Sequence, residues 1–210
     1  MNVVLTSNIF ALVKLVVCLA ITSRAFYLYA QAPKPRMFIL GLSIGVAMLT
    51  AVMELIGINA IGGIHTTTTQ WFADLGLVVA YGFILLSALG NSSTYLRRIM
   101  LWQIIMSSLL LFLLLFIPIL PKTPNPVIQL SLGVCRASIC FVAFFLYALF
   151  FVRKESRYSL LMALTFLLLM LGNVVVLPQY VLGNQSVLLF IGNLLRTGGF
   201  IAMFTAFWTN

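Results

Sequence analysis

Five charged side chains lie inside long apolar stretches of this sequence and away from the ends that adjoin its basic loops, where a lipid bilayer would surround them. They are Lys14, Glu54, Asp74, Arg136 and Arg196. A charge within a membrane span is costly, so such residues usually face the interior of a helix bundle, pair with one another and mark functional cavities. Three cations against two acids leave one net positive charge. The set therefore favours an anionic or carboxylate-bearing ligand, to which arginine offers a planar fork of donors.

The same residues have a second interpretation, in which they only hold helices together. Glu54 or Asp74 would then form a structural ion pair with Arg136 or Arg196, as polar groups in membrane bundles often do. The two acids could also lie in the headgroup region. The sequence does not show which pairs form, and both interpretations stay open at this stage.

Asn193 joins the candidate site because it precedes Arg196 by three residues, which places both on one helix face. Gly198 and Gly199 follow directly, and small residues let a neighbouring helix approach closely in a bilayer. We therefore expect Arg196 to point into the bundle.

The elements that position these residues are predicted to be membrane-spanning helices. The chain has 210 residues, of which 63% are hydrophobic and 7% charged, and its mean hydropathy is +1.17. About 20 apolar residues cross a bilayer core. The sequence predicts an all-α, polytopic membrane protein in which residues 1–210 form a single domain of seven transmembrane helices. The expected spans are 9–29, 37–56, 71–90, 99–120, 127–152, 158–177 and 186–208.

Basic residues alternate between the loops and predict the orientation of the chain. One side carries Lys34, Arg36, Arg97, Arg98, Arg153, Lys154 and Arg157, whereas the loops of the other side carry only Lys122. The positive-inside rule then places the N-terminus outside and the C-terminus in the cytoplasm, and we expect the plasma (inner) membrane. The net charge of +9 thus orients the chain and does not indicate nucleic-acid binding.

The sequence lacks the residue patterns of metal sites, disulfide frameworks and common hydrolases. Cys18, Cys135 and Cys140 fall in apolar runs without a CxxC motif, and His65 is the single histidine. No metal site, disulfide framework or bis-histidine haem is expected, and the sequence predicts no cofactor. It contains no HExxH or GxSxG motif, so an enzyme is the least supported class. The outer stretch GGIHTTTTQW, residues 62–71, is predicted to be a polar loop that could cap the cavity.

Other polar residues inside the spans are expected to form hydrogen bonds between helices. They are Thr50, Gln103, Ser107, Ser108, Thr165, Asn173 and Thr197. The fourth span has no charge and is the best candidate for a lipid-facing helix.

Two short matches suggest an internal repeat of three helices joined by the fourth span. KLVVCLA from Lys14 aligns with RASICFV from Arg136, and YGFILLSAL from Tyr81 aligns with GGFIAMFTAF from Gly198. The offsets are 122 and 117 residues. Matches this short also arise by chance, but such repeats are common in transporters, whose sites lie at the repeat interface.

Three known classes resemble this layout. The three-plus-one-plus-three arrangement is similar to SWEET-type sugar transporters, although most spans here lack their interior prolines. WFADL in the third span resembles the counter-ion segment of microbial rhodopsins, but Arg196 stands where those proteins need a lysine. The layout is also similar to the seven-helix input modules of bacterial sensor kinases and cyclases. None of the three resemblances assigns a family.

Three functions remain as expectations. The first is a non-enzymatic, receptor-like sensor that binds a small or lipidic anion from the outside. The second is a small solute transporter, and the third is a membrane-embedded subunit that meets a membrane or cytoplasmic protein partner.

Overall fold

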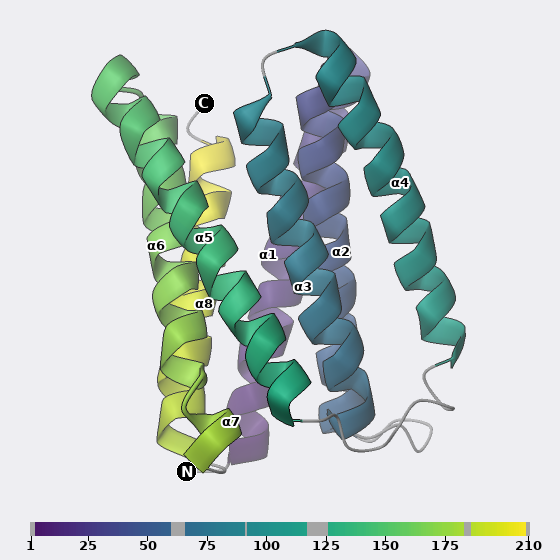
Figure 1. Ribbon diagram of the computed structural model, residues 1–210, viewed down its shortest axis with the longest axis vertical. Coiled ribbons are helices and arrows are strands. Elements are labelled where there is room, and N and C mark those ends of the chain that lie inside the picture. The colour runs from purple at the N-terminus through teal and green to yellow at the C-terminus, as the bar shows by residue number, and fades with distance from the viewer. Residues whose placement is uncertain (1–2, 60–65, 91, 117–125, 183–185, 209–210) are drawn as a thin grey trace. The chain divides into compact units, whose positions relative to one another are not determined.

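A computed structural model describes residues 3–59, 66–90, 92–116, 126–182 and 186–208, and all regular structure in these ranges is helical (Figure 1). The helices are α1 (Val3–Gln31), α2 (Pro35–Ile58), α3 (Thr66–Leu89), α4 (Ser93–Phe116), α5 (Pro126–Lys154), α6 (Arg157–Val176), α7 (Gln179–Leu182) and α8 (Ser186–Trp208). All except α7 are long and apolar enough to cross a membrane. The all-helical, multi-pass membrane architecture predicted from hydropathy is thereby confirmed.

The helices differ from the predicted spans mainly at their ends. α4 begins at Ser93 rather than at residue 99, so the fourth helix carries Arg97 and Arg98 near its start. Hydropathy marks the apolar window, whereas the backbone hydrogen bonds continue into the polar residues that flank it. The predicted loop after the sixth span contains α7, a single helical turn.

The chain divides into two compact units, and each is described by itself. One consists of Met1–Val17 with Asn125–Asn210 and the other of Cys18–Pro124, so the division falls within α1. We call them the α5–α8 unit and the α2–α4 unit after the helices that each contains in full.

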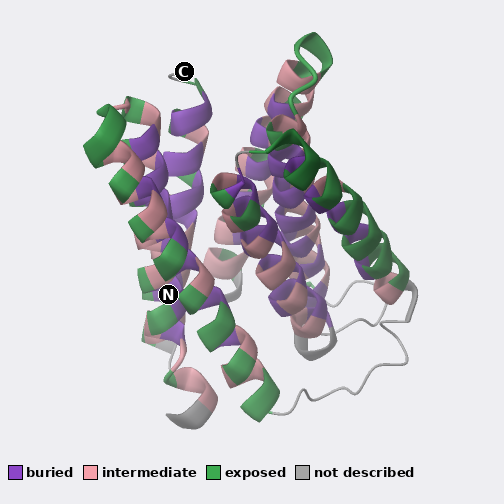
Figure 2. Cartoon of the chain, turned by 45° about the horizontal axis from the view of Figure 1, so that its top comes forward, coloured by how far each residue is buried: buried purple, intermediate pink, exposed green. Residues whose placement is uncertain are grey.

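In the α2–α4 unit, the three helices α2, α3 and α4 all pack against one another. Ile39, Phe83, Leu96 and Ile99 form a buried apolar cluster that joins them. The opposite side of α4 is exposed, as expected for a lipid-facing helix (Figure 2), with Leu101, Trp102, Leu109 and Phe112 among its exposed side chains.

In the α5–α8 unit, α6 packs against both α5 and α8. Glycines bring α6 and α8 together: a Cβ atom at Gly199 would lie 3.1 Å from the Thr165 carbonyl oxygen, and one at Gly192 would meet Val176 and lie 3.0 Å from the Gly172 oxygen. The α6 and α8 backbones therefore touch. Tyr147 of α5 stacks on Phe166 of α6 with ring centroids 5.6 Å apart, which joins α5 to α6.

Candidate functional site

Three of the predicted site residues occupy equivalent positions in three helices of the α5–α8 unit. Lys14, Arg136 and Arg196 come ten or eleven residues after the first residues of α1, α5 and α8. These helices begin at the same end of the unit (Figure 1). At ~1.5 Å per residue the three cations lie about 15 Å from that end, the half-thickness of a ~30 Å hydrocarbon core.

Two interactions between helices link the surroundings of these three cations. The Cys140 thiol lies within electrostatic reach of both the Arg136 and the Arg196 guanidinium groups. The Lys14 ammonium nitrogen lies 5.9 Å from the centroid of the Phe200 ring. Phe200 is one helical turn beyond Arg196 on the same face of α8. We call Lys14, Arg136 and Arg196 the cationic cluster.

The cationic cluster is largely shielded within the chain. Arg136 is 2% exposed and is the largest of the fully buried side chains, and Lys14 is 8% exposed. Arg196 and Asn193 are half-buried on their shared face of α8. The cluster thus combines an enclosed guanidinium with a more accessible one, next to an amide.

Gly172 of α6 makes room for Arg196. A Cβ atom at residue 172 would lie 2.8 Å from Cγ of Arg196 and 2.8 Å from the Gly192 carbonyl oxygen. Any side chain there would displace either the arginine stem or the α8 backbone. Sequence reasoning missed this residue, although glycine beside Asn173 in an apolar span was a usable signal for close helix packing. The close approach of a neighbouring helix that the sequence predicts at Gly198 and Gly199 is confirmed at Gly199, which α6 approaches. At Gly198 an added Cβ atom would make only ordinary contact with Leu168.

Asn173, the neighbour of Gly172, offers a buried acceptor. Its side-chain amide nitrogen donates to the Leu169 carbonyl at 2.8 Å, and the residue is 2% exposed. No described residue donates a hydrogen bond to its Oδ1 atom. A buried acceptor of this kind is costly unless a donor reaches it.

The two predicted acids belong to the α2–α4 unit. Asp74 of α3 is buried at 5% exposure, and Glu54 is half-buried near the end of α2. Each of the five charged residues takes part in an interaction with another residue. The structure thus gathers the three cations in one unit and places both acids in the other. Pairing between the cations and these acids stays a prediction.

The predicted polar cap is partly wrong. Residues 66–71 do not form a loop but begin α3, and Thr69 is 1% exposed. Threonine side chains are able to bond to the backbone of a nearby turn, so a run of threonines does not exclude the start of a helix. His65 lies outside the described residues.

Of the polar residues expected to link helices, Gln103 does so: its Nε2 atom donates to the Ile39 carbonyl at 2.8 Å and to the Ser43 hydroxyl at 2.7 Å. Thr50, Thr165 and Asn173 instead donate to carbonyls of their own helices. A short side chain reaches the carbonyl three or four residues earlier more easily than a neighbouring helix.

Comparison with known proteins assigns no family. No protein-family model matches the chain, and no curated protein and no solved structure is significantly similar to it. Function is therefore inferred from the residues and their arrangement.

Proposed function

We propose that this protein is a non-enzymatic, receptor-like membrane sensor that binds a small or lipidic anion through Lys14, Arg136 and Arg196. One observation carries the proposal: three helices of one unit each carry a cation ten or eleven residues after their first residue, counted from the same end of the unit. The three acids of the chain are Glu54, Asp74 and Glu155. Only Glu155 belongs to this unit, and it lies between α5 and α6, outside the helices.

The cost of this arrangement argues for a use beyond packing. Placing one Lys or Arg at the centre of a membrane helix costs about 2.5–3.5 kcal/mol on insertion scales. Close glycine contacts already join α6 and α8, and the aliphatic stem of Arg196 takes part in them at Gly172. A cationic cluster that binds an anion recovers part of its cost each time the ligand is present.

The residue types favour a carboxylate or phosphate group. Arg136 and Arg196 can each donate two parallel hydrogen bonds to such a group, whereas Lys14 adds a compact point charge. The Phe200 ring beside Lys14 favours a cation at that position. An alkyl chain attached to the anion would be accommodated by the apolar surroundings.

The proposal includes the orientation and the membrane. The basic loops favour an external N-terminus and a cytoplasmic C-terminus in the plasma membrane. A ligand that enters from outside would contact Arg196 near the middle of α8, the last helix described. Movement of α8 would then carry the signal to a cytoplasmic partner.

Binding is tested with the purified full chain in neutral detergent micelles. Octanoate and octyl phosphate are the anionic probes, and octanol is the neutral reference of equal chain length. We expect both anions, but not octanol, to raise the midpoint of thermal unfolding. The variant Arg136→Gln/Arg196→Gln should lose this increase, whereas Arg196→Lys should keep part of it because the charge remains.

The matched control is Arg153→Gln/Lys154→Gln, which removes two cations from the end of α5. It should keep the full increase in the unfolding midpoint. Equal increases in the wild type and in the Arg136→Gln/Arg196→Gln variant would show that the anions act elsewhere and would overturn the proposal.

A small transporter is the second candidate, and one observation favours it. In the aligned segments, Lys14 and Cys18 correspond to Arg136 and Cys140, and all four side chains are buried. Matching environments are expected of a duplicated unit. Uptake of labelled octanoate into vesicles that contain only this protein, abolished by Arg196→Ala, would favour transport over sensing.

A further inference from the structure

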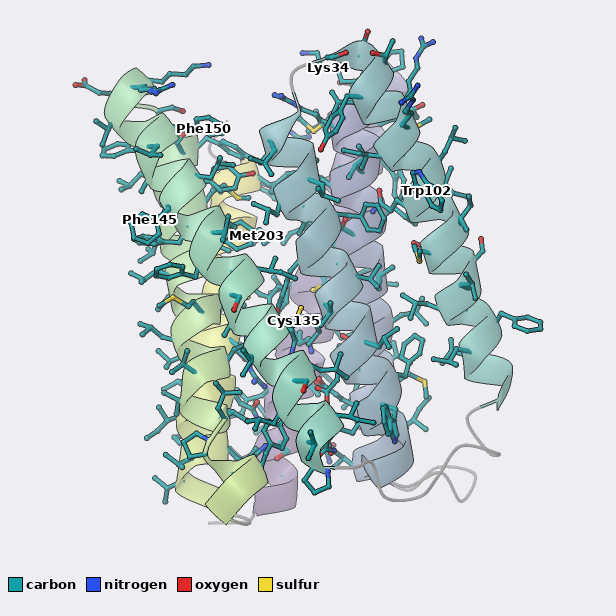
Figure 3. All side chains as sticks on the ribbon, viewed as in Figure 1. Lys34, Trp102, Cys135, Phe145, Phe150 and Met203 are labelled. Carbon is teal, nitrogen blue, oxygen red and sulfur yellow. The ribbon has the colours of Figure 1, made fainter. Side chains whose placement is uncertain are left out.

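A second group of cations gathers at one end of the α2–α4 unit, where α2 and α4 begin. It consists of Lys34, Arg36, Arg97 and Arg98, and we call it the basic end. All four residues are exposed. Figure 3 labels Lys34 at this end and Trp102 farther along α4. The proposed anion site does not include these residues.

Apolar packing fixes the positions of the two α4 arginines. Leu96 and Ile99 are buried in the cluster that they form with Ile39 and Phe83. Arg97 and Arg98 lie between these two buried residues along the helix, and both face outward. The start of α4 is thereby held against α2, and its guanidinium groups project from a rigid support.

Arg36 connects the basic end to the end of α3. Its guanidinium donates a hydrogen bond to the carbonyl of Gly90, directly after the end of α3. This contact gives the carbonyl end of α3 a donor and holds Arg36 beside the start of α4. The starts of α2 and α4 and the end of α3 thus converge on one small region.

No carboxylate lies near the basic end within its unit. The described part of the α2–α4 unit contains only Glu54 and Asp74 as acids. Along α2, Glu54 is about 27 Å from Arg36, and along α3, Asp74 is about 24 Å from Gly90, at ~1.5 Å per residue. Both distances exceed the ~8 Å over which exposed charges interact at physiological salt.

The helix ends add further positive charge. The N-terminus of a helix carries a partial positive charge and is usually complemented by acidic residues. Neither α2 nor α4 has an acid in its first turn. Lys34, at the N-cap of α2, makes no capping hydrogen bond through its side chain, and the Ser92 hydroxyl before α4 contacts the Thr94 hydroxyl instead. An anion at this end would meet both helix termini and the four cations.

The surrounding aromatic residues point to a lipid as the source of that anion. Tyr27 near the end of α1 and Tyr95 near the start of α4 are exposed large side chains. Exposed tyrosines at the ends of membrane helices lie at the level of the headgroups. We infer that the basic end is a binding site for the headgroup of an anionic phospholipid, whose phosphodiester oxygens accept hydrogen bonds from Arg97 and Arg98.

The inference is tested by titrating the full chain in neutral micelles with phosphatidylglycerol and counting bound lipids by native mass spectrometry. Phosphatidylcholine with the same acyl chains is the reference. We expect selective retention of phosphatidylglycerol, weakened about thirtyfold by Arg97→Gln/Arg98→Gln, since each basic residue near a headgroup contributes a factor of about five to lipid affinity. The variant Arg97→Lys/Arg98→Lys should retain most of the binding because its charge is unchanged.

The control Arg153→Gln/Lys154→Gln removes the same number of cations from the other unit and should leave retention unchanged. An equal loss in this control would mean that net charge alone attracts the lipid and would overturn the inference. Displacement of the lipid by excess inorganic phosphate would overturn it in favour of a free-anion site. If the double variant does not fold, Arg97→Gln and Arg98→Gln are measured singly, and each should weaken retention about fivefold. Unchanged retention in both single variants would also overturn the inference.

Discussion

The α6–α8 pair and the α2–α4 pair are joined by different chemistry. Between α6 and α8 the backbones touch, because Gly172, Gly192 and Gly199 carry no side chains. Between α2 and α4 a side chain makes the link, since the Gln103 amide donates to the Ile39 carbonyl and the Ser43 hydroxyl. Helices in a bilayer gain little from hydrophobic burial, because lipid is as apolar as their side chains. Both pairs therefore depend on other interactions, namely close packing in one and hydrogen bonds in the other.

The difference distinguishes a polar group that joins two helices from the charged groups that we propose to bind a ligand. In the α2–α4 unit a neutral amide joins helices at the modest cost of burying one polar group. In the α5–α8 unit close glycine contacts join α6 and α8, and Arg196 contributes its aliphatic stem to them at Gly172.

The largest effect should come from filling the glycine contact. In Gly199→Ala the new Cβ would lie 2.9 Å from Leu169 Cγ and 3.1 Å from the Thr165 carbonyl oxygen. We expect the free energy of unfolding to fall by about 2–3 kcal/mol, as in overpacked cores. The measurement is unfolding from mixed micelles by increasing sodium dodecyl sulfate, followed by circular dichroism.

The matched control is Gly82→Ala, at the residue that the repeat alignment places opposite Gly199. A Cβ atom there meets nothing within 4 Å. Alanine is the better helix former by about 1 kcal/mol, so this variant should be neutral or slightly more stable. Equal destabilisation of the two variants would remove the distinction drawn between the two units.

A smaller effect is expected from side-chain packing in the α2–α4 unit. Leu110 of α4 is 4% exposed, whereas its neighbour Leu109 is 57% exposed. Leu110→Ala should cost about 2 kcal/mol, the lower end of the usual range, because only the cavity contributes when the surroundings are lipid. Leu109→Ala should change stability by less than ~0.5 kcal/mol. Equal losses of stability for the two substitutions in the same unfolding assay would show that α4 does not have one packed side and one lipid-facing side.

The smallest effect should come from the polar link itself. Gln103→Leu removes the two hydrogen bonds to α2 and should lower the free energy of unfolding by about 1 kcal/mol, near the average for such bonds in membrane proteins. Ser108→Ala, at an exposed position on the same helix, is the control and should have no measurable effect. A loss above ~3 kcal/mol for Gln103→Leu would show that this amide, rather than apolar packing, dominates the α2–α4 contact.

Of the two sequence matches that suggest an internal repeat, one aligns residues with similar burial and the other aligns residues with different surroundings. The aligned cation–cysteine pairs, Lys14 with Cys18 and Arg136 with Cys140, are buried in both places. The aligned glycines differ, since Gly82 faces open space and Gly199 faces α6. The second match shares only the three residues Gly-Phe-Ile. Three shared residues do not predict which face of a helix becomes buried, because that depends on the helices packed around it.

The sequence alone determined the membrane-spanning helices, since length and hydropathy are properties of each segment and do not depend on its neighbours. It also identified Lys14, Arg136 and Arg196 as costly residues for the same reason. Only the tertiary structure showed that these cations share one unit and that Gly172 makes room for Arg196. It also placed Glu54 and Asp74 in the other unit. Such groupings depend on which helix faces meet, and side-chain shape and close backbone contact decide this rather than hydropathy.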